Sequence, residues 1–194
     1  AMIWIVAYFF SPAQSLAFIS ILLYASWLGF TNAFAREKDK KFWVLGLILY
    51  PTLPLLAMLD IYRDYGSVGL LWLIVIVAVC DTAAYFTGRA IGKIPFSPAS
   101  PKKTLEGVIG GVIAATVIGA LIGIAFLPTW KAILIAFIVA IAGVFGDLFE
   151  SSLKRGADMK DSGTILPGHG GVLDRLDGHL FGAVALYALM KALY

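Results

Sequence analysis

Acidic, basic and hydroxyl side chains gather in residues 147–178, a polar stretch of an otherwise strongly apolar chain. At its start, Asp147, Glu150, Ser151 and Lys154 fall at i, i+3, i+4 and i+7, the spacing that places side chains on one face of a helix. A face that carries both signs of charge and a hydroxyl group is unsuited to lipid, so it indicates water, a partner or a ligand. The simpler alternative is that Lys154 pairs with the two acids at a solvated helix end.

A second acidic pair, Asp174 and Asp177, opens the last apolar stretch. If this start is helical, the i, i+3 spacing points both carboxylates the same way. Two or three converging carboxylates, without several Cys or His residues, form a hard-oxygen site that suits Mg²⁺ far better than Zn²⁺. The alternative is a helix N-terminus at which the helix dipole favours acidic residues.

Cations and glycines lie between these acids. Positive charge beside a carboxylate-bound metal suggests a polyphosphate substrate. The segment Pro167–Gly171 fits the same ligand, because glycines let the backbone approach closely and successive N–H groups can form an anion nest. This segment lacks the Gly-Lys-Ser/Thr ending of a Walker loop, and its His169 could equally be an ordinary loop histidine. The basic residues are Lys154, Arg155, Lys160 and Arg175.

A second polar pattern lies further upstream. Asp81, Tyr85 and Arg89 recur at i, i+4 and i+8 and form one polar stripe along a helix, although Asp81 and Arg89 could simply pair at a helix end. Lys102 and Lys103, beside hydroxyl residues and a glycine, could bind phosphate. They could equally mark topology or touch the lipid surface.

Membrane helices are the elements that must position these residues. Of the 194 residues, 60% are hydrophobic and only 14% are charged, with a mean hydropathy of +0.90, whereas soluble domains are about 45–50% apolar and about 25% charged. We therefore expect a single all-α domain, residues 1–194, built as a polytopic transmembrane helical bundle. The expected elements are an N-terminal remnant at 2–10 and six spans at 13–33, 42–59, 67–88, 107–127, 131–149 and 176–193.

Small residues in the fourth expected span favour close helix packing over ligand binding. Gly107, Gly110 and Gly111 carry this pattern, which could pack helices within one chain or between the two chains of a homodimer. The single cysteine, Cys80, lies in an apolar run and is expected to be a small buried residue.

Lys and Arg residues indicate the orientation. Twelve of the 15 lie in residues 36–41, 89–103 and 154–175, which all fall on one side if the spans alternate. By the positive-inside rule that side is cytoplasmic. We therefore expect a multi-pass protein of the cytoplasmic membrane with its polar site facing the cytoplasm, the bilayer as a partner, and no nucleic acid.

Four motifs follow one another in the polar stretch. They are Ser151-Ser152-Leu153-Lys154-Arg155, Lys160-Asp161-Ser162-Gly163, Leu166-Pro167-Gly168-His169-Gly170-Gly171 and Asp174-Arg175-Leu176-Asp177. Together they resemble the C-terminal signature of the phosphatidate cytidylyltransferase, or CDP-diacylglycerol synthase, family. Two upstream segments, 81–85 and 100–107, also look like family features, and the likeness covers roughly residues 60–194. Because family members usually carry additional N-terminal spans, we expect this chain to be truncated at its N-terminus.

The resemblance implies a Mg²⁺-dependent nucleotidyltransferase that makes CDP-diacylglycerol and pyrophosphate from CTP and phosphatidate. On this hypothesis Mg²⁺ binds Asp147, Asp174 and Asp177, with room for a second cation. The four basic residues named above hold phosphates, and Lys102 and Lys103 receive the lipid phosphate. The remaining residues expected to shape the nucleotide loop or bind substrate are Asp161, His169, Gly168, Gly170, Gly171, Asp81, Tyr85 and Ser151.

Rival functions of two kinds remain, enzymatic and non-enzymatic. A CDP-alcohol phosphotransferase also uses membrane aspartates, but its Asp-Gly, Ala-Arg and spaced-Asp pattern is not found, and a synthase acting on ether-linked lipid is closer. A non-enzymatic alternative is an ion-coupled transporter, which predicts charges at the membrane midplane and internal repeats. The acids here cluster near one interface instead.

Overall fold

The computed structural model describes residues 40–156, 158–159, 161–162 and 173–193, together with single residues between 14 and 27. The expected remnant at 2–10 lies outside the described residues, as does most of the expected span 13–33. The described part is mostly helical, and three of its helices are long and apolar enough to cross a membrane: Thr52–Ile91, Leu105–Gly123 and Thr129–Gly156. The six-span count stays a prediction.

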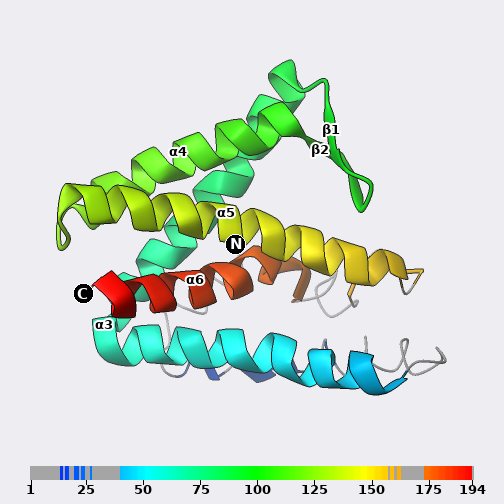
Figure 1. Ribbon diagram of the computed structural model, residues 1–194, viewed down its shortest axis with the longest axis horizontal. Coiled ribbons are helices and arrows are strands. Elements are labelled where there is room, and N and C mark those ends of the chain that lie inside the picture. The colour runs from blue at the N-terminus through cyan, green and yellow to red at the C-terminus, as the bar shows by residue number, and fades with distance from the viewer. Residues whose placement is uncertain are drawn as a thin grey trace.

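The first long helix, α3, runs from Lys40 to Ile91 and contains two of the expected spans. The segment between these spans, residues 60–66, is mostly helical, and the chain changes direction at Gly66 (φ 69°, ψ −164°). This conformation is open to glycine because it has no Cβ. Figure 1 shows that the first part of α3 runs alongside α6, while its second part crosses behind the bundle to reach α4.

A short β-hairpin, absent from the expected all-helical fold, follows α3. Strands β1 (Pro95–Ser97) and β2 (Ser100–Thr104) pair antiparallel, with Ser97 opposite Ser100. Helix α4 (Leu105–Gly123) starts directly after β2, and the Thr104 hydroxyl caps it by accepting a hydrogen bond from the Gly107 N–H at 3.2 Å. The chain between the expected spans 67–88 and 107–127 therefore contains a hairpin that leads directly into a helix.

Helix α4 packs against both α3 and α5 (Thr129–Gly156) through small residues. The buried face of α4 consists of glycines and alanines, and a Cβ built on Gly111 would lie 2.6 Å from the Cys80 carbonyl oxygen. The opposite face exposes the larger apolar side chains of Ile109, Ile113 and Leu121. The predicted packing role of the glycines is confirmed, and α4 leaves its bulkier side exposed.

The chain closes with the 3₁₀ turn η1 (Leu173–Arg175) and helix α6 (Asp177–Leu193). The hairpin, the end of α5 and the start of α6 lie toward one end of the bundle, whereas α6 ends beside the bend of α3 (Figure 1). Lys191 forms an ion pair with Asp64 at 2.8 Å there, and Lys131 donates to the Leu193 carbonyl. Cys80 is buried as expected.

Candidate active site

The predicted polar face of α5 is formed in the structure. The Ser151 hydroxyl donates to Asp147 Oδ1 at 3.3 Å, one helical turn away. On its other oxygen, Asp147 forms an ion pair with Lys103, which reaches it from strand β2 across 44 positions of sequence. The hairpin thus contributes a cation to an acidic group that the α5 helix supplies.

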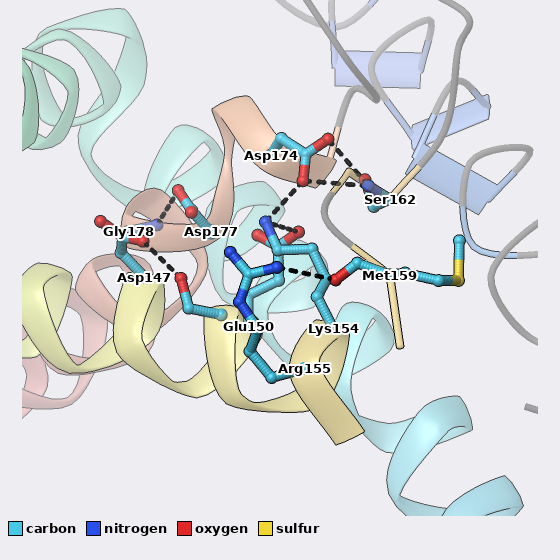
Figure 2. Close-up of polar contacts among 10 residues, drawn as sticks. Asp147, Glu150, Lys154, Arg155, Met159, Ser162, Asp174, Asp177 and Gly178 are labelled. Atoms are coloured by element: carbon cyan, nitrogen blue, oxygen red, sulfur yellow. Dashed lines mark hydrogen bonds and ion pairs between the residues drawn. The ribbon is translucent and has the colours of Figure 1, made fainter. Parts of the chain in front are cut away.

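Lys154 lies between two carboxylates from different elements (Figure 2). Its Nζ is 3.2 Å from Glu150 Oε1 on α5 and 2.6 Å from Asp174 Oδ1 on η1. The backbone N–H of Ser162 donates to both Asp174 oxygens, at 2.9 and 3.1 Å. Glu150 is fully buried and Lys154 is 8% exposed, and removing one partner of such a buried pair typically costs about 3–5 kcal/mol.

Asp177 occupies the first position of α6, and its Oδ1 accepts from the Gly178 N–H at 2.7 Å. Helices α5 and α6 approach so closely here that a Cβ on Gly146 would lie 2.5 Å from the Asp177 carbonyl. Asp174 and Asp177 do not share one helix, which was the condition for their predicted common direction, because η1 ends at Arg175 and α6 begins at Asp177. Both carboxylates nevertheless lie beside Glu150.

These contacts form one carboxylate–lysine cluster. Carboxylates outnumber lysines in it, and the oxygen donors match Mg²⁺ in chemistry. Among the described residues, no three Asp, Glu, His or Cys side chains are arranged, as they stand, to hold a metal ion together. The members of the cluster are Asp147, Glu150, Asp174, Asp177, Lys103 and Lys154.

Only part of the predicted polar stripe of Asp81, Tyr85 and Arg89 lies near this cluster. Asp81 lies within electrostatic reach of Asp147 and Lys103. The Arg89 guanidinium instead donates to the Tyr85 hydroxyl at 3.0 Å, and both side chains are exposed. Lys102 also points outward, because successive residues of a strand face opposite sides.

Several predicted site residues lie at the edge of the cluster or outside the described residues. Arg155 is exposed and donates to the Met159 carbonyl at 3.1 Å, and Asp161 and Arg175 are also exposed. Their predicted roles stay predictions. The predicted residues outside the described part are Lys160, Gly168, His169, Gly170 and Gly171.

Two contributions to the site were not predicted. Glu150 was placed on the polar face and paired with Lys154 only in the simpler alternative of a solvated helix end, so it was given no role in the site; the pair forms but is buried. The backbone N–H of Ser162 contacts Asp174 across 12 positions, and no side-chain pattern signals a contact of that kind.

Comparisons with known proteins agree with the resemblance seen in the motifs. A family model described as "Cytidylyltransferase family" matches residues 1–193. The phosphatidate cytidylyltransferase of Helicobacter pylori (strain 26695) is 44% identical over 189 residues, which cover 96% of this chain and 69% of that protein. Its namesake from Thermotoga maritima is 43% identical over 155 residues, or 75% of this chain and 57% of the relative. The Bacillus subtilis protein of the same name is 41% identical over 131 residues, 66% of this chain and 49% of its own length.

Proposed function

The chain belongs to the cytidylyltransferase family, and we propose that it transfers CMP from CTP to phosphatidate, giving CDP-diacylglycerol and pyrophosphate. The relatives of that name match it over most of its length. The observation that carries the proposal is the convergence of the carboxylate–lysine cluster at one end of apolar helices. A lipid substrate can reach such a site from the bilayer, while a nucleotide reaches it from water.

The reaction is an in-line displacement at phosphorus. A phosphate oxygen of phosphatidate bonds to the α-phosphorus of CTP, and the bond from that phosphorus to the bridging oxygen of the β-phosphate breaks. The electron pair leaves with pyrophosphate. Because the attacking phosphate is already anionic, no strong general base is needed, and catalysis consists of positioning and charge neutralisation.

Lys103 and Lys154 are suited to that task. Each is held in place by a carboxylate, at the base of the hairpin and at the end of α5 respectively. A fixed ammonium group costs little reorganisation when a phosphate binds. Lys102, Arg155 and Arg175 lie at the exposed rim, where they would attract the polyanionic nucleotide.

Asp147, Asp174 and Asp177 would hold Mg²⁺. When bound, the ion offsets negative charge on the triphosphate and on the departing pyrophosphate. The converging carboxylate oxygens of the carboxylate–lysine cluster support this assignment. EDTA should stop the reaction and added Mg²⁺ should restore it; activity that survives EDTA would contradict the metal requirement.

We place the cluster on the cytoplasmic face of a bacterial inner membrane and keep the six-span topology as part of the proposal. The basic hairpin and the basic end of α5 support this orientation. Mass spectrometry of the lipid extract after incubation with CTP, phosphatidate and Mg²⁺ tests the activity. The expected product is CDP-diacylglycerol. If the folded wild-type protein forms none, the proposal is contradicted.

A further inference from the structure

Glu150 is the only fully buried acid among the residues that the structure describes. It lies on α5, one turn before Lys154, and its Oε1 is 3.2 Å from the Lys154 Nζ. Among the described residues, Glu150 forms an ion pair with Lys154 alone. Its acidic neighbours, Asp174 and Asp177, carry the same charge. The Lys154 ammonium is therefore the cation that compensates this buried charge.

An aromatic cluster lies on the same part of the bundle. The Tyr50 ring is 5.0 Å from the Phe149 ring and 6.0 Å from the Phe181 ring, measured between centroids. Tyr50 lies near enough to Glu150 for the two to interact electrostatically, and its hydroxyl is itself buried without a hydrogen-bond partner. Because Glu150 is shielded from water, removing Lys154 would leave a buried charge uncompensated.

The two carboxylates beside Lys154 differ in their other contacts. Asp174 also accepts from the Ser162 backbone and lies on a short 3₁₀ turn, and it is a residue proposed to hold Mg²⁺. Glu150 lies within a long helix. If Asp174 exchanges Lys154 for another cation, Glu150 still holds the ammonium in place (Figure 2).

We infer that Glu150 is a positioning residue, whose charge holds the Lys154 ammonium where a substrate phosphate meets it. The inference rests on the proposed function, because Lys154 is taken to contact a phosphate of CTP or phosphatidate. It adds a requirement that the motifs do not contain, namely a buried acid that acts only through its lysine.

A double-mutant cycle on the full chain tests this coupling. The four proteins are the wild type, Glu150→Gln, Lys154→Met and the double variant, each measured for kcat/KM of pyrophosphate release and for melting temperature. Glu150→Gln should lower kcat/KM by about tenfold or more, mainly through kcat, and the double variant should be no slower than Lys154→Met alone. Lys154→Met should lower the melting temperature by leaving Glu150 unpaired, and the double variant should regain most of that loss.

Two further variants sharpen the result. Glu150→Asp keeps the charge and should recover part of the activity that Glu150→Gln loses. Asp64→Asn is the matched control, since Asp64 pairs with Arg63 and Lys191 at the other end of the bundle; it should leave kcat/KM unchanged.

Three outcomes would overturn the inference. If the wild type is active, a normal kcat/KM for Glu150→Gln shows that Glu150 does not position the Lys154 ammonium. Multiplicative losses in the double variant show that Glu150 acts independently of Lys154. A folded wild type that releases no pyrophosphate defeats the proposed function and this inference with it, whereas the first two outcomes leave the proposed function intact.

Discussion

Lys102 and Lys103 are adjacent in sequence but differ in their surroundings. From the sequence, both lysines were expected to receive the lipid phosphate. Strand alternation separates them, so Lys103 pairs with Asp147 whereas Lys102 is exposed. The hairpin that causes this difference has no clear sequence signal, because prolines and lysines are uncommon in strands.

This difference gives a matched pair of variants. Lys103→Met should lower kcat/KM by about 100-fold, because it removes a fixed positive charge from the site. Lys102→Met should change it by less than about threefold, as for an exposed charge. Steady-state assays at constant ionic strength measure both, and equal losses would contradict the distinction.

Asp177 should be essential for turnover but not for folding. Asp177→Asn keeps the size of the side chain and an oxygen that can still accept from the Gly178 N–H. Loss of its charge should reduce kcat by about 100-fold or more, while the melting temperature stays near that of the wild type. Near-normal activity would remove Asp177 from the proposed metal site.

At the scale of residues, the sequence correctly predicted the contacts between residues of the same helix. The i, i+4 pairs on α5 follow from helical spacing alone and are formed. The contacts of Lys103 with Asp147 and of Lys154 with Asp174 join segments 44 and 20 positions apart. No periodicity within one element encodes such pairings, so they required the structure.

At the scale of elements, apolar runs predicted most of the helices. The expected spans 107–127 and 131–149 correspond to α4 and α5, although α5 continues to Gly156 and carries the polar face beyond the apolar run. The predicted helix ends were wrong where a helix is polar, because hydropathy detects apolar segments suited to lipid and not the helical backbone itself.

Close packing of α4 predicts a specific loss of stability. In Gly111→Ala the new Cβ would lie 2.6 Å from the Cys80 carbonyl oxygen, so the helices must separate at a cost of about 1–3 kcal/mol. Gly156→Ala is the control, because nothing lies within 4 Å of a Cβ there. Thermal unfolding in detergent compares the two, and an unchanged melting temperature for Gly111→Ala would contradict the packing described.

At the scale of the whole molecule, the distribution of basic residues agrees with the arrangement of the helices. The hairpin and the end of α5 lie at one end, and the Lys191–Asp64 pair lies where α6 ends beside the bend of α3. For these two basic segments the grouping agrees with the predicted alternation of spans, whereas most of the third segment, residues 36–41, lies outside the described residues.

The same arrangement predicts labelling from opposite sides of a membrane. Cys80 is buried and is the chain's single cysteine, so the wild type should give little background. Lys102→Cys should react with an impermeant maleimide from the cytoplasmic side, and Lys191→Cys from the other side, in sealed vesicles of known orientation. Reaction of both from one side would contradict the topology.

The most direct test of the central claim is pyrophosphate release by the purified protein in detergent. CTP, dispersed phosphatidate and Mg²⁺ are supplied together and then omitted one at a time, with Asp174→Asn assayed in parallel. We predict release that requires all three components and is lost in the variant, since Asp174 joins Lys154 and the Ser162 backbone at the centre of the cluster. Release without phosphatidate, or undiminished release by Asp174→Asn, would contradict the claim that this cluster performs cytidylyl transfer to a lipid.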